Sequence, residues 1–473
     1  MRASPDKYYQ GYNPKSSSKI KNIKIAHELK EDGFAMTSHK PISLLTEMAD
    51  GDTQATAAAT AAATAAATTA ATAPPPPSPG LVKRLCDAAQ VGDTATVRVL
   101  INKDPALSNA TFGAHGTILH MAAKSGSVDL CKYLAHSTAF TAFDSTCVSN
   151  QQKGATILHY AVLSGCVETV SFILGLALGT SPDFTAANAQ TVAGLTALHW
   201  AAQKGDLGVC RALLFSAAFS AVNTVSSSGV TALHIAGTCG HVDVCSLLLK
   251  SKRFTVANSA NSSGMTALHC AAYKGHLLTV NALLESNRFT AHNALDRKRG
   301  MTALHFASHQ GHVGVALALI AAARFSVGRC LDSNGMSALH WAARGNCDSV
   351  CRAILASEGF IEVYVRSADG RSALDMAATL GHEQACSTIL EFMGDGRSGA
   401  DTASALNCAV SKGHENVAAL FILDPASLAE ATRINLSPAS RMVVDLMTRL
   451  AFAPGGSGAD AAATEFTAAA AFT

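Results

Sequence analysis

Residues 231–249 read Thr-Ala-Leu-His-Ile-Ala-Gly-Thr-Cys-Gly-His-Val-Asp-Val-Cys-Ser-Leu-Leu-Leu. The first part of this stretch, Thr/Ser-x-Leu-x-x-Ala followed by Gly or Asn, occurs nine times between residues 117 and 413. We call the residue that follows the Leu the anchor. The nine anchors are His120, His159, His199, His234, His269, His305, His340, Asp375 and Asn407. Neighbouring anchors lie 32 to 40 residues apart. A period of roughly 20 to 50 residues indicates a stacked array of repeats.

Each repeat carries the signals of two short helices. The Thr or Ser three residues before the anchor is a good helix N-cap, and the anchor side chain can interact with the exposed amides of the first turn. The anchors are therefore predicted to be capping residues. Gly six residues after the anchor is expected to end the helix in a left-handed conformation, with Asn346 in that place in one copy. A second helix follows, as in residues 241–249. Both helices are too short to be stable alone, so each repeat depends on its neighbours.

Two of the steps between anchors are longer than the others. A Phe recurs twenty residues after most anchors, and its position locates the extra residues near Leu178–Pro182 in one repeat and within Thr141–Gly154 in another. Insertions in repeat arrays map to connecting loops, so we expect both to leave the helices unchanged.

These residues resemble the ankyrin repeat, whose Thr-Pro-Leu-His-x-Ala signature is matched by Thr231-Ala-Leu-His-Ile-Ala236 and the corresponding residues of the other copies. The resemblance covers roughly residues 81–423. The Pro of the family is Ala or Ile here, and the repeats are mostly about two residues longer. The resemblance implies a mostly α, helix-turn-helix solenoid of about ten units with hairpin or loop tips between repeats. It also implies that protein partners bind the loop tips and the concave face formed by the first helices.

The flanks of the array differ from it in composition. Residues 55–73 are almost entirely Ala and Thr and lead into Pro74–Pro77, which is typical of a linker. Residues 1–50 fit either disorder or a small docking segment. The predicted organisation is a disordered segment at 1–50, a low-complexity linker at 51–80, the solenoid at 81–423, a capping-helix region at 424–453 and a disordered tail at 454–473.

Composition excludes several classes of protein. Only 15% of the residues are charged and the formal net charge is +2, whereas a general nucleic-acid binder usually has a strong basic excess. No apolar run reaches the length of a membrane span, and the N-terminus lacks a secretory signal. We therefore expect no nucleic acid, no membrane insertion, and a cytoplasmic or nuclear monomer.

Five of the thirteen cysteines share one repeat position, eleven residues after the anchor. They are Cys131, Cys210, Cys245, Cys351 and Cys386. Other repeats have Val or Ala there, so the position is predicted to be a buried site for a small side chain rather than a metal ligand. We expect neither a metal nor a cofactor.

Catalysis is not expected from this pattern. A catalytic site needs unlike groups that converge on one place, whereas these histidines recur at one repeat position each. The sequence has no Gly-rich phosphate loop, Gly-x-Ser-x-Gly or His-Glu-x-x-His motif.

Two sets of residues that differ between repeats are candidate partner-binding residues. The first is basic: Arg253, Arg288 and Arg324 precede the recurring Phe in three consecutive repeats, and Arg297, Lys298 and Arg299 lie in a loop between two of them. This strip would suit an acidic or phosphorylated partner. Alternatively, it is a solvated edge on which the Arg stems cover apolar surface.

The second set is aromatic and occupies the position after the anchor. It comprises Tyr160, Trp200, Phe306 and Trp341. Aromatic side chains there could contact a partner or pack between adjacent repeats, and the sequence leaves both open.

The sequence thus predicts a non-catalytic scaffold or adaptor that binds another protein. One alternative is a substrate-recruiting subunit of a ubiquitin ligase, kinase or phosphatase complex. Another is an uncharacterised enzyme within residues 1–80.

Overall fold

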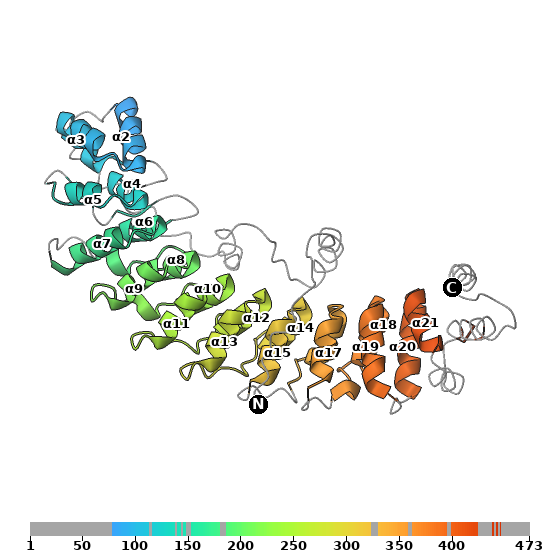
Figure 1. The fold of residues 1–473 in the computed structure, drawn as a ribbon. Coiled ribbons are helices and arrows are strands. Elements are labelled where there is room, and N and C mark those ends of the chain that lie inside the picture. The colour runs from blue at the N-terminus through green and yellow to red at the C-terminus, as the bar shows by residue number, and fades with distance from the viewer. Residues whose placement is uncertain are drawn as a thin grey trace, which may run out of the picture. The chain divides into compact units, whose positions relative to one another are not determined.

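The computed structural model describes residues 78–423 apart from eight short gaps, together with Pro438, Arg441, Met442 and Asp445. The gaps are residues 113–115, 138–139, 143–144, 148–152, 180–185, 323–329, 358–361 and 395–398. Within this part of the chain, twenty α-helices follow one another as ten pairs, without a strand (Figure 1). The predicted helical solenoid of about ten units is confirmed.

Each pair consists of a first and a second helix. The pairs are α2 (Pro79–Val91) with α3 (Thr94–Lys103), α4 (Ile118–Ser125) with α5 (Val128–Ala135), α6 (Ile157–Ser164) with α7 (Val167–Gly179), α8 (Ala197–Lys204) with α9 (Leu207–Phe215), α10 (Ala232–Cys239) with α11 (Val242–Lys250), α12 (Ala267–Lys274) with α13 (Leu277–Glu285), α14 (Ala303–Gln310) with α15 (Val313–Ala321), α16 (Ala338–Arg344) with α17 (Asp348–Leu355), α18 (Ala373–Leu380) with α19 (Glu383–Met393), and α20 (Gly399–Ser411) with α21 (Glu415–Leu423). Every first helix packs against the first helix of the next pair, and every second helix against the next second helix. The array is therefore two layers of helices stacked in chain order.

Eight first helices begin as predicted, with the anchor as part of the cap. The prediction is wrong for Asn407, because α20 already begins at Gly399 and this anchor lies within the helix. At α10 the backbone N–H of Thr231 donates to His234 Nδ1 at 3.2 Å, and the Thr231 hydroxyl lies 2.8 Å from the same nitrogen. The same reciprocal cap starts α4, α6, α8, α12, α14, α16 and α18. These caps satisfy N–H groups that a helix end would otherwise leave without a partner.

The ends of the first helices also follow the sequence. Gly240 ends α10 with φ of 76°. Among the described residues, Asn346 is the only non-glycine residue with a positive φ, which is 53°. Asn tolerates this conformation better than other side chains, which explains the substitution.

A short hairpin turn, which we call a finger, joins one pair to the next. Described fingers span residues 191–195, 226–230, 261–265, 296–301, 332–336 and 367–371, and the first N–H of each donates to its last carbonyl at 2.8–3.0 Å. Adjacent fingers are linked by one further backbone hydrogen bond. The linking pairs are Val192 N to Lys153 O, Ser227 N to Ala193 O, Ser262 N to Ser228 O, Arg297 N to Ser263 O, Ser333 N to Arg299 O and Ala368 N to Asn334 O. A continuous backbone ladder therefore runs across the fingers.

The core lies between the two layers and between successive pairs. In the α10–α11 unit, Leu233, Ala236, Cys245, Leu248 and Phe254 are each 0% exposed. Burial of one such large apolar side chain stabilises the fold by about 1.5–3 kcal/mol.

The recurring cysteines are buried, as predicted. Each of the five is 0% exposed, and every cysteine in the described residues is a free thiol. Burial raises the pKa of the Cys131, Cys210, Cys245 and Cys386 thiols to about 12. These groups behave as small apolar side chains.

The insertion near Leu178 differs from the prediction. α7 has 13 residues and extends to Gly179, whereas α9 and α11 have 9. The sequence after Ile173 is Leu-Gly-Leu-Ala-Leu, which keeps an apolar side chain at helical spacing, and Leu176 is 7% exposed. Part of the insertion is therefore helix rather than loop.

Several predicted segments lie outside the described residues. They include residues 1–50, most of the linker at 51–80 and the tail at 454–473. Four residues of the predicted capping region are described, each of them helical. The domain boundaries remain predictions. None of the described helices combines the length and the apolar character needed to cross a bilayer.

Candidate functional site

The anchor histidines join neighbouring units. In five of the seven, Nδ1 accepts from the cap of its own helix and Nε2 donates to a backbone carbonyl of the following finger, whereas Nε2 of His120 and of His305 is buried without such a contact. The observed pairs are His159 with Leu195, His199 with Val230, His234 with Met265, His269 with Met301 and His340 with Arg371, at 2.9–3.1 Å. Burial lowers the pKa of His159, His199 and His234 to about 4. These rings are neutral at pH 7, with both nitrogens used within the array.

A second histidine set starts the second helices. In each of four such residues, Nε2 lies 2.9–3.1 Å from a carbonyl in the first helix of the preceding unit. These residues are His241, His276, His312 and His414. Both recurring histidine sets thus connect units rather than converging on a reaction centre.

Arg253 and Arg288 bind backbone of the preceding unit. The Arg253 guanidinium donates to Leu214 O and Ser216 O, both at 2.7 Å, and to Phe219 O. Arg288 makes the equivalent contacts with the carbonyls of Leu249, Ser251 and Phe254. Cations favour the carbonyl end of a helix, so each Arg caps the second helix of its neighbour. Arg324 lies outside the described residues.

The remaining predicted basic residues form the tip of the finger at 296–301, which we call the basic finger. Arg297 and Lys298 are exposed, and Arg299 is half-buried. The buried Asp296 carboxylate accepts the backbone N–H groups of Lys298 at 3.1 Å, Arg299 at 3.3 Å and Met301 at 2.6 Å. The finger backbone is therefore fixed from within.

The four predicted aromatic residues are buried between units. Tyr160 is 1% exposed, Trp200 9%, Phe306 4% and Trp341 3%. Tyr160, Trp200 and Phe306 each pack edge-on against the anchor histidine of the preceding unit. This is the packing alternative left open by the sequence, and a direct partner contact stays a prediction.

Trp341 is the centre of a group that the structure assembles from two fingers and the helices α14 and α16. The guanidinium carbons of Arg299 and Arg344 lie 5.6 and 5.8 Å from the centre of its ring. The His309 ring packs edge-on at 5.1 Å, and the indole N–H donates to Asp332 at 3.1 Å.

A second group of aromatic and cationic side chains lies between α12 and α14. Lys274 Nζ lies 5.3 Å from the Tyr273 ring, and Tyr273 packs edge-on against Phe306 at 6.0 Å. Sequence reasoning missed Lys274, Tyr273, His309 and Arg344. They occupy the fourth and fifth positions after their anchors. Several repeats have polar or aromatic residues at these positions, and this pattern could have indicated them.

A protein-family model described as ankyrin repeats in three copies matches this chain in five overlapping segments. They are residues 85–186, 149–223, 176–258, 198–294 and 287–367. The chain belongs to the ankyrin-repeat family. The helix pairs continue past the matched residues to Leu423, so the ankyrin array is longer than the match. Ankyrin repeats are protein-interaction modules, and this chain accordingly carries a protein-binding array.

One curated relative is the probable E3 ubiquitin-protein ligase XBOS33 from Oryza sativa subsp. japonica. It is 32% identical over 133 residues, which are 28% of this chain and 23% of the relative. The chain thus matches less than a quarter of the length of that relative.

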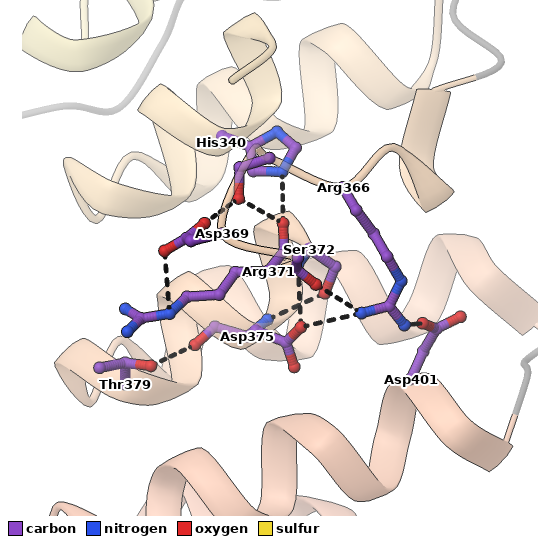
Figure 2. A network of polar contacts seen from close by, with 10 residues as sticks. His340, Arg366, Asp369, Arg371, Ser372, Asp375, Thr379 and Asp401 are labelled. Atoms are coloured by element: carbon purple, nitrogen blue, oxygen red, sulfur yellow. Dashed lines mark hydrogen bonds and ion pairs between the residues drawn. The ribbon is translucent and has the colours of Figure 1, made fainter. Parts of the chain in front are cut away.

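The ankyrin unit with α18 departs from the others because its anchor is Asp375. The carboxylate accepts the Ser372 backbone N–H at 2.8 Å and so preserves the cap. Figure 2 shows Arg366 between this carboxylate, at 3.8 Å, and Asp401 of the next unit. An ionic contact therefore connects the last two ankyrin units, in addition to the contact of His414 with the Thr379 carbonyl.

Proposed function

We propose that this protein is a non-catalytic scaffold or adaptor that binds a protein partner on its fingers and first helices. The observation that carries the proposal is the use of the recurring polar groups. Five anchor histidines, Arg253 and Arg288 donate hydrogen bonds to backbone carbonyls of adjacent units. The residues that differ between repeats and reach solvent, above all those of the fingers, are left to distinguish partners.

The predicted site residues have two roles in this proposal. Arg297 and Lys298 contact the partner directly, together with Arg299. Arg253 and Arg288, with Tyr160, Trp200, Phe306 and Trp341, hold neighbouring units in register beneath that surface, and Arg324 stays a predicted partner-binding residue. A rigid surface binds with a smaller entropic cost than one that must be ordered.

A second candidate is a substrate-recruiting subunit of an enzyme complex, located in the cytoplasm or nucleus. The name of the rice relative, a probable ubiquitin ligase, supports this version over a kinase or phosphatase adaptor. The array would hold the substrate, and the enzyme would be supplied by other residues or by another chain.

Site-specific photocrosslinking in cells that produce the protein tests the proposal. A benzophenone amino acid is placed at the exposed finger residues Ser262 and Ser333, and at the exposed second-helix residues Arg211 and Leu317 as matched controls. We expect one protein to be crosslinked from both fingers and not from the second helices. Crosslinks only from the second helices, or none to protein, would refute it. Ligase subunits among the adducts would favour the second candidate.

A further inference from the structure

The basic finger is one residue longer than the fingers beside it. In residues 261–265 and 332–336 the closing hydrogen bond joins residues four apart, whereas Asp296 pairs with Met301, five apart. The step from His269 to His305 is accordingly 36 residues instead of 35. The additional residue extends the tip Arg297-Lys298-Arg299.

This longer finger is held in place on both sides. Arg297 N donates to Ser263 O at 2.8 Å, and Ser333 N donates to Arg299 O at 2.7 Å. The backbone ladder therefore continues through the insertion, and Asp296 fixes the tip from inside. The three cationic side chains are presented on an ordered backbone, which lowers the entropic cost of binding.

Positive charge is concentrated around this finger. Arg299 and Arg344 come from different segments of the chain, and both lie over the Trp341 ring. The tips of the two neighbouring fingers are Ser262-Ser263 and Ser333-Asn334, which are uncharged. The basic group thus has neutral polar borders.

We propose that the basic finger, with Arg344, is a binding site for an acidic segment of the partner protein. The inference rests on the proposed function and names the chemistry of the partner. Arg side chains bind carboxylates through two parallel hydrogen bonds, and stacking on Trp341 pre-orients the guanidinium groups of Arg299 and Arg344. Clustered Asp and Glu or phosphorylated Ser supply the same anionic groups.

A protein segment fits this surface better than a nucleic acid. The cations of this site come from one finger and the end of α16, whereas a nucleic-acid site requires a basic stripe that follows several phosphates. The net charge of the whole chain is only +2.

The test measures fluorescence anisotropy with the full chain and four probes. These are a glutamate-rich peptide, its glutamine version, its phosphoserine version and single-stranded RNA of similar length. The site variant is Arg297→Glu with Lys298→Glu. The control is Arg211→Glu with Lys252→Glu, which changes the charge equally at exposed residues elsewhere. Circular dichroism verifies that both variants retain their helices.

We expect the glutamate or phosphoserine peptide to bind and the glutamine peptide to bind at least about tenfold more weakly. The site variant should lose about tenfold in affinity and the control less than about twofold, and added salt should weaken binding. Whichever anionic peptide binds more tightly identifies the source of the charge.

Equal binding by the site variant and the wild type would overturn the inference. Preferential RNA binding that the site variant loses would also overturn it and assign a nucleic-acid site. Failure here is distinct from failure of the proposed function. A finger crosslink to a partner that persists in the site variant would keep the scaffold and reject the acidic-segment site.

Discussion

A single histidine such as His234 performs two tasks at the residue scale. It caps its own helix, donates to the Met265 carbonyl of the next unit, and does so while only 1% exposed. The acceptor role of Nδ1 and the donor role of Nε2 require the neutral ring. Protonation would place a second donor against the Thr231 N–H, so this residue links stability to pH.

We expect the array to lose stability as pH falls from about 6.5 towards 4. Burial holds the pKa of His159, His199 and His234 near 4, below the unfolded value of about 6.5, so the unfolded chain binds more protons in this window. The contribution is complete above pH 6.5 and declines by about 1.4 kcal/mol per histidine per pH unit below it. Urea unfolding at pH 7.5 and 5.5 measures the loss. His199→Asn, which removes one of these titrating rings, should reduce the pH slope. A midpoint that does not change with pH would contradict this account.

Arg253 should matter for stability through its three carbonyl partners. We expect Arg253→Ala to lower the unfolding free energy by about 1–3 kcal/mol, because carbonyls at the end of α9 lose a charged donor. Arg253→Lys should retain only part of this unfolding free energy, since an ammonium group cannot reproduce the planar fork of the guanidinium. The exposed neighbour Lys252, changed to Ala, serves as control with an effect within about 0.5 kcal/mol. Equal values for Arg253→Ala and the control in urea melts would show that these hydrogen bonds contribute nothing.

At the scale of the element, the helix pairs follow from local sequence signals. Thr231 starts a helix, Gly240 ends it and apolar spacing builds the next, so the fold was predictable. α7 was mispredicted because the insertion has no helix-breaking residue before Gly179. The Arg253 contacts could not be predicted, because their acceptors lie 34 to 39 residues earlier and depend on how units register. For the same reason, the sequence could not predict that Arg299 and Arg344 both lie over the Trp341 ring.

The junction of α16 and α17 offers a test at this scale. Asn346 has φ of 53°, a conformation that costs an ordinary side chain roughly 1–2 kcal/mol and glycine little. We therefore expect Asn346→Ala to lower the unfolding free energy by about 1 kcal/mol, with Asn346→Gly equal to or above the wild type. Chemical denaturation of the three proteins ranks them. Ala above Gly in that ranking would be incompatible with a left-handed helix end here.

Across the whole molecule, the units interact chiefly with their immediate neighbours. Stability in such an array approximates a sum of unit and interface contributions, so the effect of a local change should remain local. The ionic contact of Arg366 with Asp375 and Asp401 is therefore expected to control the C-terminal units without affecting distant ones.

Arg366→Gln tests this localisation. The change leaves two poorly exposed carboxylates, with side-chain exposures of 1% and 11%, without their shared cation. We expect a loss of about 1–3 kcal/mol, moderated because the Arg366 side chain is 42% exposed. Hydrogen exchange should accelerate in α18 and α20 and stay unchanged in α8 and α10. Acceleration along the entire array would instead require a single cooperative unit.

The five recurring cysteines can report local unfolding of individual units. One thiol is buried at the same place in α5, α9, α11, α17 and α19, and burial holds each in the unreactive protonated form. A thiol can react only after its own unit opens. The order in which an alkylating reagent labels the five cysteines would therefore show which end of the array unfolds locally first. The measurement needs no inserted probe.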